Sequence, residues 1–298
     1  MQRAAAVSTG PYTHLDHLGV LASLLSIPLI VIDERSYALA KTFYPQSEVV
    51  FKQPGELTLD FLAENFDLLL GCGKYWCLEL QPLFELLYRK KMRFALCPHG
   101  NSDKGSTAET HPQQDIAFIY GEQMEKMMRD NGMMEKVTAV VRTGNYRYPF
   151  YLKHHAFYDA LAERQIFYKL SKQKKTILYA PTWSSKTTPL QFFHTCESLI
   201  QTLSSEYNLL IKPHPFTEED VVGELSLLHA KHEHNSNVAF ADGFPAIYPL
   251  LARCDAYLGD YSSIGYDFLA FDRPLYFFQT SHQNPTLIAQ AGVELGED

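Results

Sequence analysis

Polar residues with catalytic potential stand directly after several short apolar runs of this chain. Lys212 and His214 occur in the segment KPHP, and Ser262 and Ser263 occur in GDYSS. A lysine and an imidazole can neutralise the charge that develops on a leaving phosphate. Two serines that open a helix stand at its N-terminus, where free backbone N–H groups and the helix dipole favour an anion. We therefore expect a phosphate or diphosphate here, although either serine can also be read as a simple N-cap.

His99 is the candidate general base, because an imidazole accepts a hydroxyl proton near neutral pH. Gly100 follows it and permits close approach of a substrate. Asp103 and Lys104 lie in the same loop. Asp103 can orient His99 and Lys104 can bind phosphate, but a solvated charged loop explains both residues equally well.

Two further segments carry candidate residues. Thr182 and Trp183 belong to APTW, where an aromatic side chain can line a donor pocket or simply pack. His14 opens the first expected helix and is a candidate acceptor-side residue, and His17 follows three positions later. No HExxH or Cys–His pattern and no DxD-like acidic pair accompanies these histidines. The sequence thus predicts chemistry without a metal ion or another cofactor.

The elements that position these residues are short apolar runs that alternate with longer amphipathic stretches. This pattern is typical of parallel strands joined by crossover helices. Strands are expected at 28–33, 67–72, 94–98, 116–120, 140–143, 176–180, 208–212, 238–240, 256–259 and 275–278. Helices are expected at 14–26, 76–90, 123–131, 151–170, 190–204, 218–232, 247–253 and 264–270.

The candidate residues follow the expected strands, and ligands of open α/β sheets bind outside the carboxyl ends of the strands. We therefore predict an α/β fold with two Rossmann-like lobes, residues 1–148 and 149–298, whose parallel sheets face a central cleft. A length of 298 residues suits two such lobes.

Composition excludes several classes of protein. A net charge of −8 makes nucleic acid an improbable partner. Five scattered cysteines without CxxC spacing fit a reducing cytoplasm, and no apolar run is long enough for export or membrane insertion. The basic clusters at 89–93 and 172–175 are read as solvated helix ends, with weak contact to anionic lipid at the inner face of the membrane as the alternative.

The ordered set HG, YAPTW, KPHP and DYSSxxYD resembles the CDP-glycerol glycerophosphotransferase family of teichoic-acid and capsule synthesis. The resemblance covers about 94–278. It implies a GT-B fold and metal-independent transfer of a polyol phosphate from a CDP-activated donor to a polymer, lipid-linked or glycan acceptor. The N-terminal lobe would then serve the acceptor, and the C-terminal lobe would bind the nucleotide donor.

The resemblance also assigns roles to individual residues. His99 matches the proposed base, His214 the histidine that contacts the donor diphosphate, and Ser262 with Ser263 the diphosphate-binding loop. Asp260 and Asp267 occupy acidic positions of the same motif. Asp267 either holds the polyol hydroxyls of the donor or supports the loop.

Two alternatives stay open at this stage. One is a GT-B glycosyltransferase or epimerase that uses a CMP- or UDP-sugar. The other is a nucleotide-binding protein that kept the scaffold and lost catalysis. The second alternative draws on Ser184, which stands where the family usually has arginine after APTW.

Overall fold

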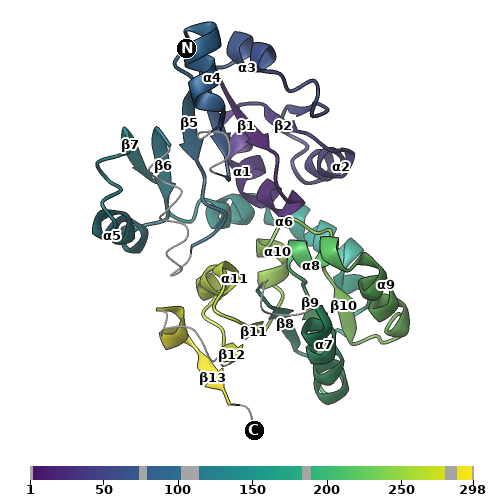
Figure 1. Cartoon of the computed structure of the whole chain (residues 1–298). Helices are drawn as coiled ribbons and strands as arrows, with labels where there is room; N and C mark the ends of the chain where they lie inside the picture. The colour runs from purple at the N-terminus through teal and green to yellow at the C-terminus, as the bar shows by residue number, and fades with distance from the viewer. Residues whose placement is uncertain (1–2, 74–78, 102–113, 183–188, 279–286, 297–298) are drawn as a thin grey trace. The chain divides into compact units, whose positions relative to one another are not determined.

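A computed structural model describes residues 3–73, 79–101, 114–182, 189–278 and 287–296. The chain divides into two compact units, Met1–Phe150 and Tyr151–Asp298. Each unit contains one sheet whose strands all pair in parallel (Figure 1).

The first unit contains a seven-stranded sheet with the order β3-β2-β1-β4-β5-β6-β7. Its strands are β1 (Ala4–Ser8), β2 (Leu29–Val31), β3 (Val49–Phe51), β4 (Leu68–Gly71), β5 (Arg93–Leu96), β6 (Ile116–Ile119) and β7 (Ala139–Arg142). Its helices are α1 (Leu15–Leu25), α2 (Glu34–Phe43), α3 (Leu59–Asn65), α4 (Gln81–Tyr88) and α5 (Glu122–Asp130), with a 3-10 turn at Tyr12–His14.

One core cluster of the first unit lies between its sheet and two helices. Ala5, Val7 and Ile30 of the sheet pack against Leu62 of α3 and Phe84 of α4. All five side chains are buried. Burial of apolar surface stabilises this packing by roughly 25 cal/mol for each Å² removed from water.

The second unit repeats the arrangement with a six-stranded sheet of order β10-β9-β8-β11-β12-β13. Its strands are β8 (Thr176–Ala180), β9 (Asn208–Ile211), β10 (Val238–Phe240), β11 (Ala256–Gly259), β12 (Leu275–Phe278) and β13 (Val293–Leu295). Its helices are α7 (Pro189–Leu203), α8 (Pro215–Asp220), α9 (Val222–Lys231), α10 (Tyr248–Leu251) and α11 (Ser263–Phe268), and α6 (Arg147–Gln165) leads into it from the first unit.

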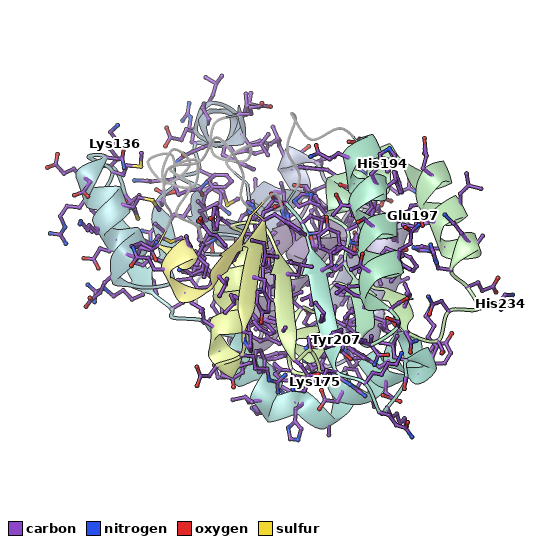
Figure 2. The ribbon with its side chains drawn as sticks, turned by 90° about the horizontal axis from the view of Figure 1, so that it is seen from below. Lys136, Lys175, His194, Glu197, Tyr207 and His234 are labelled. Atoms are coloured by element: carbon purple, nitrogen blue, oxygen red, sulfur yellow. The ribbon has the colours of Figure 1, made fainter. Side chains whose placement is uncertain are left out.

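Helices α7 and α9 cover the same face of the second sheet. Ile200 of α7 and Leu225 of α9 belong to one apolar cluster with Leu209 of β9. Glu197 of α7, which Figure 2 labels beside His194, accepts a hydrogen bond of 2.8 Å from Lys231 at the end of α9. The two helices therefore pack side by side.

Both sheets have the strand order of a Rossmann fold, in which the chain reverses its winding direction between two central strands. These strands are β1 and β4 in the first unit and β8 and β11 in the second. Ligands of open α/β sheets bind outside the carboxyl ends of the strands at this reversal. The loops after β1, β4, β8 and β11 are therefore the expected ligand-binding segments of this fold.

The structure confirms the predicted strands and adds β1, β3 and β13, as well as α2 and α3. The expected helix at 218–232 is two helices, α8 and α9, separated at Val221, whose φ of −135° is not helical. For the expected helix at 76–90, the described residues contain α4, which runs from Gln81 to Tyr88. Its C-cap residue, Arg89, has a left-handed backbone conformation. The predicted cleft and the separate roles of the lobes stay predictions.

Candidate active site

His99 lies just beyond the carboxyl end of β5, where Cys97 and Pro98 are buried and the chain turns outward. Gly100 has a φ of 132°, a conformation that favours glycine and explains this residue after the histidine. The His99 ring also makes a hydrogen bond with the backbone of Cys72, which follows β4. Two adjacent strand ends therefore hold this imidazole.

The pKa of His99 is lowered from its ordinary value of 6.5. Solvent reaches the side chain, yet the protein around it removes enough water to disfavour the imidazolium, and the charge of Arg147 acts in the same direction. The hydrogen bond with Cys72 opposes this shift, which identifies the His99 ring nitrogen as its donor. The other ring nitrogen then carries the lone pair that a general base needs.

Two more histidines, His14 and His17, come from the first turns that follow β1. The rings of His14 and His99 have centroids 5.4 Å apart with planes inclined by 33°. His17 Nδ1 lies 3.3 Å from the hydroxyl of Tyr120, which follows β6. The structure thus gathers loops after β1, β4, β5 and β6 around His99.

Both of these neighbours are neutral at physiological pH. Burial lowers the pKa of His14 to about 3, and the nearby His99 adds to the shift. Burial also lowers the pKa of His17 well below its usual value, with a further contribution from Arg147. Protonation of either ring is therefore disfavoured beside the candidate base.

A buried ion pair lies beneath the cluster. Arg147 Nη1 donates a hydrogen bond of 2.6 Å to the carboxylate of Asp16, and both side chains are nearly inaccessible to solvent. Next to it, the Tyr146 hydroxyl lies 2.9 Å from Cys97 Sγ, and the Tyr146 ring stacks on Tyr120. These contacts fix the ends of β5 and β6 with respect to α1.

In the second unit, Thr182 and Asp260 join the loops after β8 and β11. The backbone N–H and the hydroxyl of Thr182 donate to the same oxygen of Asp260, at 2.9 and 3.0 Å. These two hydrogen bonds link the loops on either side of the reversal point between β8 and β11. Asp260 therefore has a structural role here, and any contact with the donor stays a prediction.

Ser262 is the N-cap residue of α11, but its side chain makes no capping hydrogen bond. Its hydroxyl lies 2.9 Å from the hydroxyl of Tyr257, which also contacts the carbonyls of Ala180 and Asp260. Since carbonyls only accept, the phenol proton is directed to them and Ser262 donates to Tyr257. Tyr257 thus fixes the GDYSS loop from below, and Ser263 is the first residue of α11.

Asp267 of α11 is buried and accepts a hydrogen bond of 2.8 Å from the hydroxyl of Tyr248. Tyr248 in turn stacks on Tyr151, with ring centroids 6.2 Å apart. This contact agrees with the supporting role that the sequence left open for Asp267. Contact with the polyol hydroxyls stays a prediction.

Lys212 and His214 follow β9. Lys212 is buried and donates to the carbonyls of Ala241 and Phe244, so its ammonium ties the ends of β9 and β10 together. His214 caps α8, because its Nδ1 accepts a hydrogen bond of 3.3 Å from the backbone N–H of Phe216. A neutral His214 therefore carries its proton on Nε2, where it can be donated to an anion.

Lys104 and Trp183 lie outside the described residues, so their predicted roles stay predictions. Sequence reasoning did not identify three residues of the site, Tyr120, Arg147 and Tyr257. Tyr120 was detectable, because it ends an expected strand at the same sheet edge. The residues that the structure describes contain no group of three or more His, Cys, Asp or Glu side chains that could hold a metal ion.

The two parallel sheets and the strand ends that carry these residues define a GT-B fold, as several solved structures confirm. The wall teichoic acid polymerase TagF superposes with a TM-score of 0.65 at 15% identity, covering 93% of this chain and 69% of the polymerase. UDP-GlcNAc 2-epimerase from Neisseria meningitidis superposes with a TM-score of 0.61 at 14% identity, covering 99% of this chain and 87% of the epimerase. Identities this low establish the fold alone.

The model of the CDP-glycerol:poly(glycerophosphate) glycerophosphotransferase family matches residues 98–284. The chain belongs to this family. Teichoic acid glycerol-phosphate primase of Bacillus subtilis (strain 168) is 32% identical over 108 residues, which are 36% of this chain and 26% of the primase. Teichoic acid poly(ribitol-phosphate) polymerase of Bacillus spizizenii is 24% identical over 188 residues, which are 61% of this chain and 27% of the polymerase.

The matches thus span about a quarter of the length of these two relatives. No helix among the residues that the structure describes has the length and apolar character needed to cross a bilayer.

Proposed function

We propose that this chain transfers glycerol phosphate, or a related polyol phosphate, from a CDP-activated donor to an acceptor hydroxyl in the synthesis of a cell-envelope polymer. Family membership supports the class of reaction. The strongest support for the proposal is that His99 is neutral and is held by a hydrogen bond at one of its ring nitrogens. One ring nitrogen is engaged at Cys72, and the lowered pKa keeps a lone pair on the other nitrogen at neutral pH.

In the proposed reaction, His99 removes the proton of the acceptor hydroxyl. The acceptor oxygen then forms a bond to the phosphorus that carries the polyol, and the bond from this phosphorus to the CMP oxygen breaks. CMP leaves with the bonding electron pair. General-base catalysis of this kind contributes about 10²–10⁴-fold to a rate.

The second unit supplies the proposed donor site. His214 offers its Nε2–H to the diphosphate. The backbone N–H groups in the first turn of α11, which begins at Ser263, donate to the same anion, because the Ser262 side chain makes no capping hydrogen bond with them. Thr182, Asp260 and Lys212 position these loops, and Asp267 positions α11. Trp183, Lys104 and Gly100 complete the predicted substrate contacts. No metal ion takes part in this proposal.

The proposed acceptor is a polymer, lipid-linked molecule or glycan with a free hydroxyl, and the proposed location is the inner face of the membrane. Helix α4 offers a surface for weak contact with an anionic bilayer. Leu83, Leu86 and Leu87 are exposed on one face of the helix, and Arg89 and Lys91 are exposed just beyond its end. Phe84 of the same helix is buried and anchors it to the sheet.

The test measures CMP release from CDP-glycerol in the presence of a glycerol-phosphate primed acceptor. His99→Ala should lower kcat by about 10²–10⁴-fold, and His214→Ala should also abolish most of the turnover. His194→Ala is the matched control, because His194 is exposed on α7, as Figure 2 shows, and should keep full activity. Turnover should also persist in EDTA.

Full turnover by both His99→Ala and His214→Ala would contradict the assigned chemistry. Loss of turnover in EDTA, restored by a divalent cation, would contradict the metal-independent step.

A further inference from the structure

Residue 14 lies outside the segment that the family model matches, so nothing in the family comparison gives it a role. The structure nevertheless brings its ring to His99 across 85 positions of sequence. We propose that His14 is a positioning residue that holds the imidazole of His99 in the orientation in which it acts as base. This inference rests on the proposed function, in which His99 is that base.

The rings of His14 and His99 pack against each other. Their centroids are 5.4 Å apart, a distance within the range of 4.5–7 Å at which aromatic rings attract each other. His99 is held on one side by its hydrogen bond to the Cys72 backbone. The His14 ring, inclined by 33° to it, supplies a second contact. A hydrogen bond alone leaves the ring free to tilt, and the second contact restricts that motion.

The loop after β1 leaves space for the ring of His14. A Cβ on Gly10 would lie 2.5 Å from Cε1 and 2.6 Å from Nδ1 of His14, closer than real contacts allow. The glycine therefore lets the ring lie directly against the backbone of its own loop. The His14 ring is thus confined between Gly10 and His99.

The His14 side chain has no other structural role among the described contacts. It occupies the N-cap position of α1 but makes no capping hydrogen bond. Its neighbour His17 has a different partner, the hydroxyl of Tyr120. Among the residues that the structure describes, Arg147 is the charged group that acts on His17 and His99, and it is paired with Asp16. His14 thus contributes an uncharged ring rather than a charge, which agrees with its pKa of about 3.

The experiment compares His14→Ala, His14→Phe and Gly10→Ala. His14→Ala removes the ring, His14→Phe keeps an aromatic ring without nitrogen, and Gly10→Ala displaces the native ring. Gly55→Ala is the matched control, because a Cβ on Gly55 meets nothing within 4 Å. Circular dichroism establishes that each variant is folded.

The first readout is the NMR titration of the His99 imidazole in the full chain without substrate. His14→Ala and Gly10→Ala should move the His99 pKa upward toward 6.5, because water enters where the ring was. His14→Phe and Gly55→Ala should leave it close to the native value. The groups that also act on His99 in this titration are Arg147 and the Cys72 backbone, and neither is altered.

The second readout is the pH profile of kcat. His14→Ala and Gly10→Ala should lower kcat by about 10–100-fold, because a small misplacement of a catalytic group has an effect of this size. The acid limb of the profile should shift with the NMR titration, and KM for the donor should stay unchanged. His14→Phe should recover most of the lost rate.

An unchanged His99 titration in both His14→Ala and Gly10→Ala would overturn the proposal. So would equal losses in His14→Ala and His14→Phe, since His14 would then act through its nitrogen atoms. If the native chain fails to release CMP from CDP-glycerol, the proposed function fails, but the NMR comparison still decides whether His14 positions His99.

Discussion

The carboxylate of Asp16 accepts a hydrogen bond of 2.6 Å from Arg147, and the two side chains are 9% and 3% exposed. They lie 131 positions apart in the chain, on α1 and at the start of α6. The pair therefore links the first helix of the first unit to the last segment of the same unit. The charge of Arg147 also lowers the pKa of His17 and of His99.

Arg147→Met should lower the free energy of unfolding by about 3–5 kcal/mol, because it leaves the Asp16 carboxylate buried without its partner. Chemical denaturation of the purified chain measures this change. Arg129→Met is the control, because Arg129 pairs with Glu125 at the surface and its side chain is 68% exposed. Loss of an exposed pair should cost about 0–1 kcal/mol. Equal effects of the two substitutions would contradict the view that the buried pair holds the first unit together.

The neutral histidines predict how stability depends on pH. Unfolded His14 and His17 bind a proton near pH 6.5, whereas folded His14 does so only near pH 3 and folded His17 well below its ordinary value. Between these limits the unfolded state binds more protons, so stability rises with pH through this window and is lost on acidification. The full contribution is present above about pH 6.5.

Denaturation at pH 7 and at pH 4.5 measures this effect, and His17→Gln is the informative variant. Glutamine does not titrate and can still bond to Tyr120, so the variant should lose less stability on acidification than the native chain. Carboxylates elsewhere in the chain titrate equally in both proteins and cancel in the comparison. Identical pH dependence of the two proteins would show that His17 accepts a proton freely in the folded state.

Much of the scaffold was predictable from the sequence, because buried parallel strands leave short apolar runs of three to five residues. The runs at 176–180, 238–240, 256–259 and 275–278 match strands β8, β10, β11 and β12 in both bounds. β1 was missed. Its sequence AAAVS is mostly alanine, which favours helices, yet a strand at the centre of the sheet with a helix over it requires small side chains.

The candidate site was predictable only in part, for a physical reason. The position of His99 after a strand indicated chemistry, because the carboxyl ends of parallel strands form binding sites. Its contact with His14 depends on how the loops after β1 and β5 approach each other, and no local pattern encodes this. Lys212 shows the reverse case. Its position indicated a phosphate contact, whereas its ammonium is directed to two carbonyls inside the unit.

Tyr257→Phe tests the role of the tyrosine beneath the GDYSS loop. The substitution removes the group that contacts the Ala180 and Asp260 carbonyls and the Ser262 hydroxyl. Loss of a buried hydrogen-bonding group should destabilise the chain by about 1–3 kcal/mol. The variant should also bind CDP about tenfold more weakly, which corresponds to a free-energy cost of about 1.4 kcal/mol for ordering the GDYSS loop on binding.

Urea denaturation and calorimetric titration with CDP measure the two effects. Tyr207→Phe is the control, because Tyr207 directly precedes β9, at the opposite end of the strands from GDYSS, and Figure 2 labels it there beside Lys175. Native affinity for CDP in Tyr257→Phe would show that the hydroxyl does not set the conformation of the loop.

Helix α4 predicts binding to anionic vesicles. Leu86 and Leu87 are 76% and 59% exposed, and Arg89, Lys91 and Arg93 are exposed beside them, whereas Lys90 is paired with Asp67. Apolar side chains can enter the interface while the cations face lipid phosphates, at about 1 kcal/mol for each cation. The native chain should therefore sediment with phosphatidylglycerol vesicles and much less with phosphatidylcholine vesicles.

Replacing Arg89, Lys91 and Arg93 with alanine should weaken this binding by about tenfold or more, and Leu86→Glu should act in the same direction. Leu227→Glu is the matched control, because Leu227 is 72% exposed on α9 in the second unit and should leave binding unchanged. Binding that ignores lipid charge, or that falls equally in Leu227→Glu, would contradict a bilayer contact at α4. A native chain that binds neither kind of vesicle would contradict it as well.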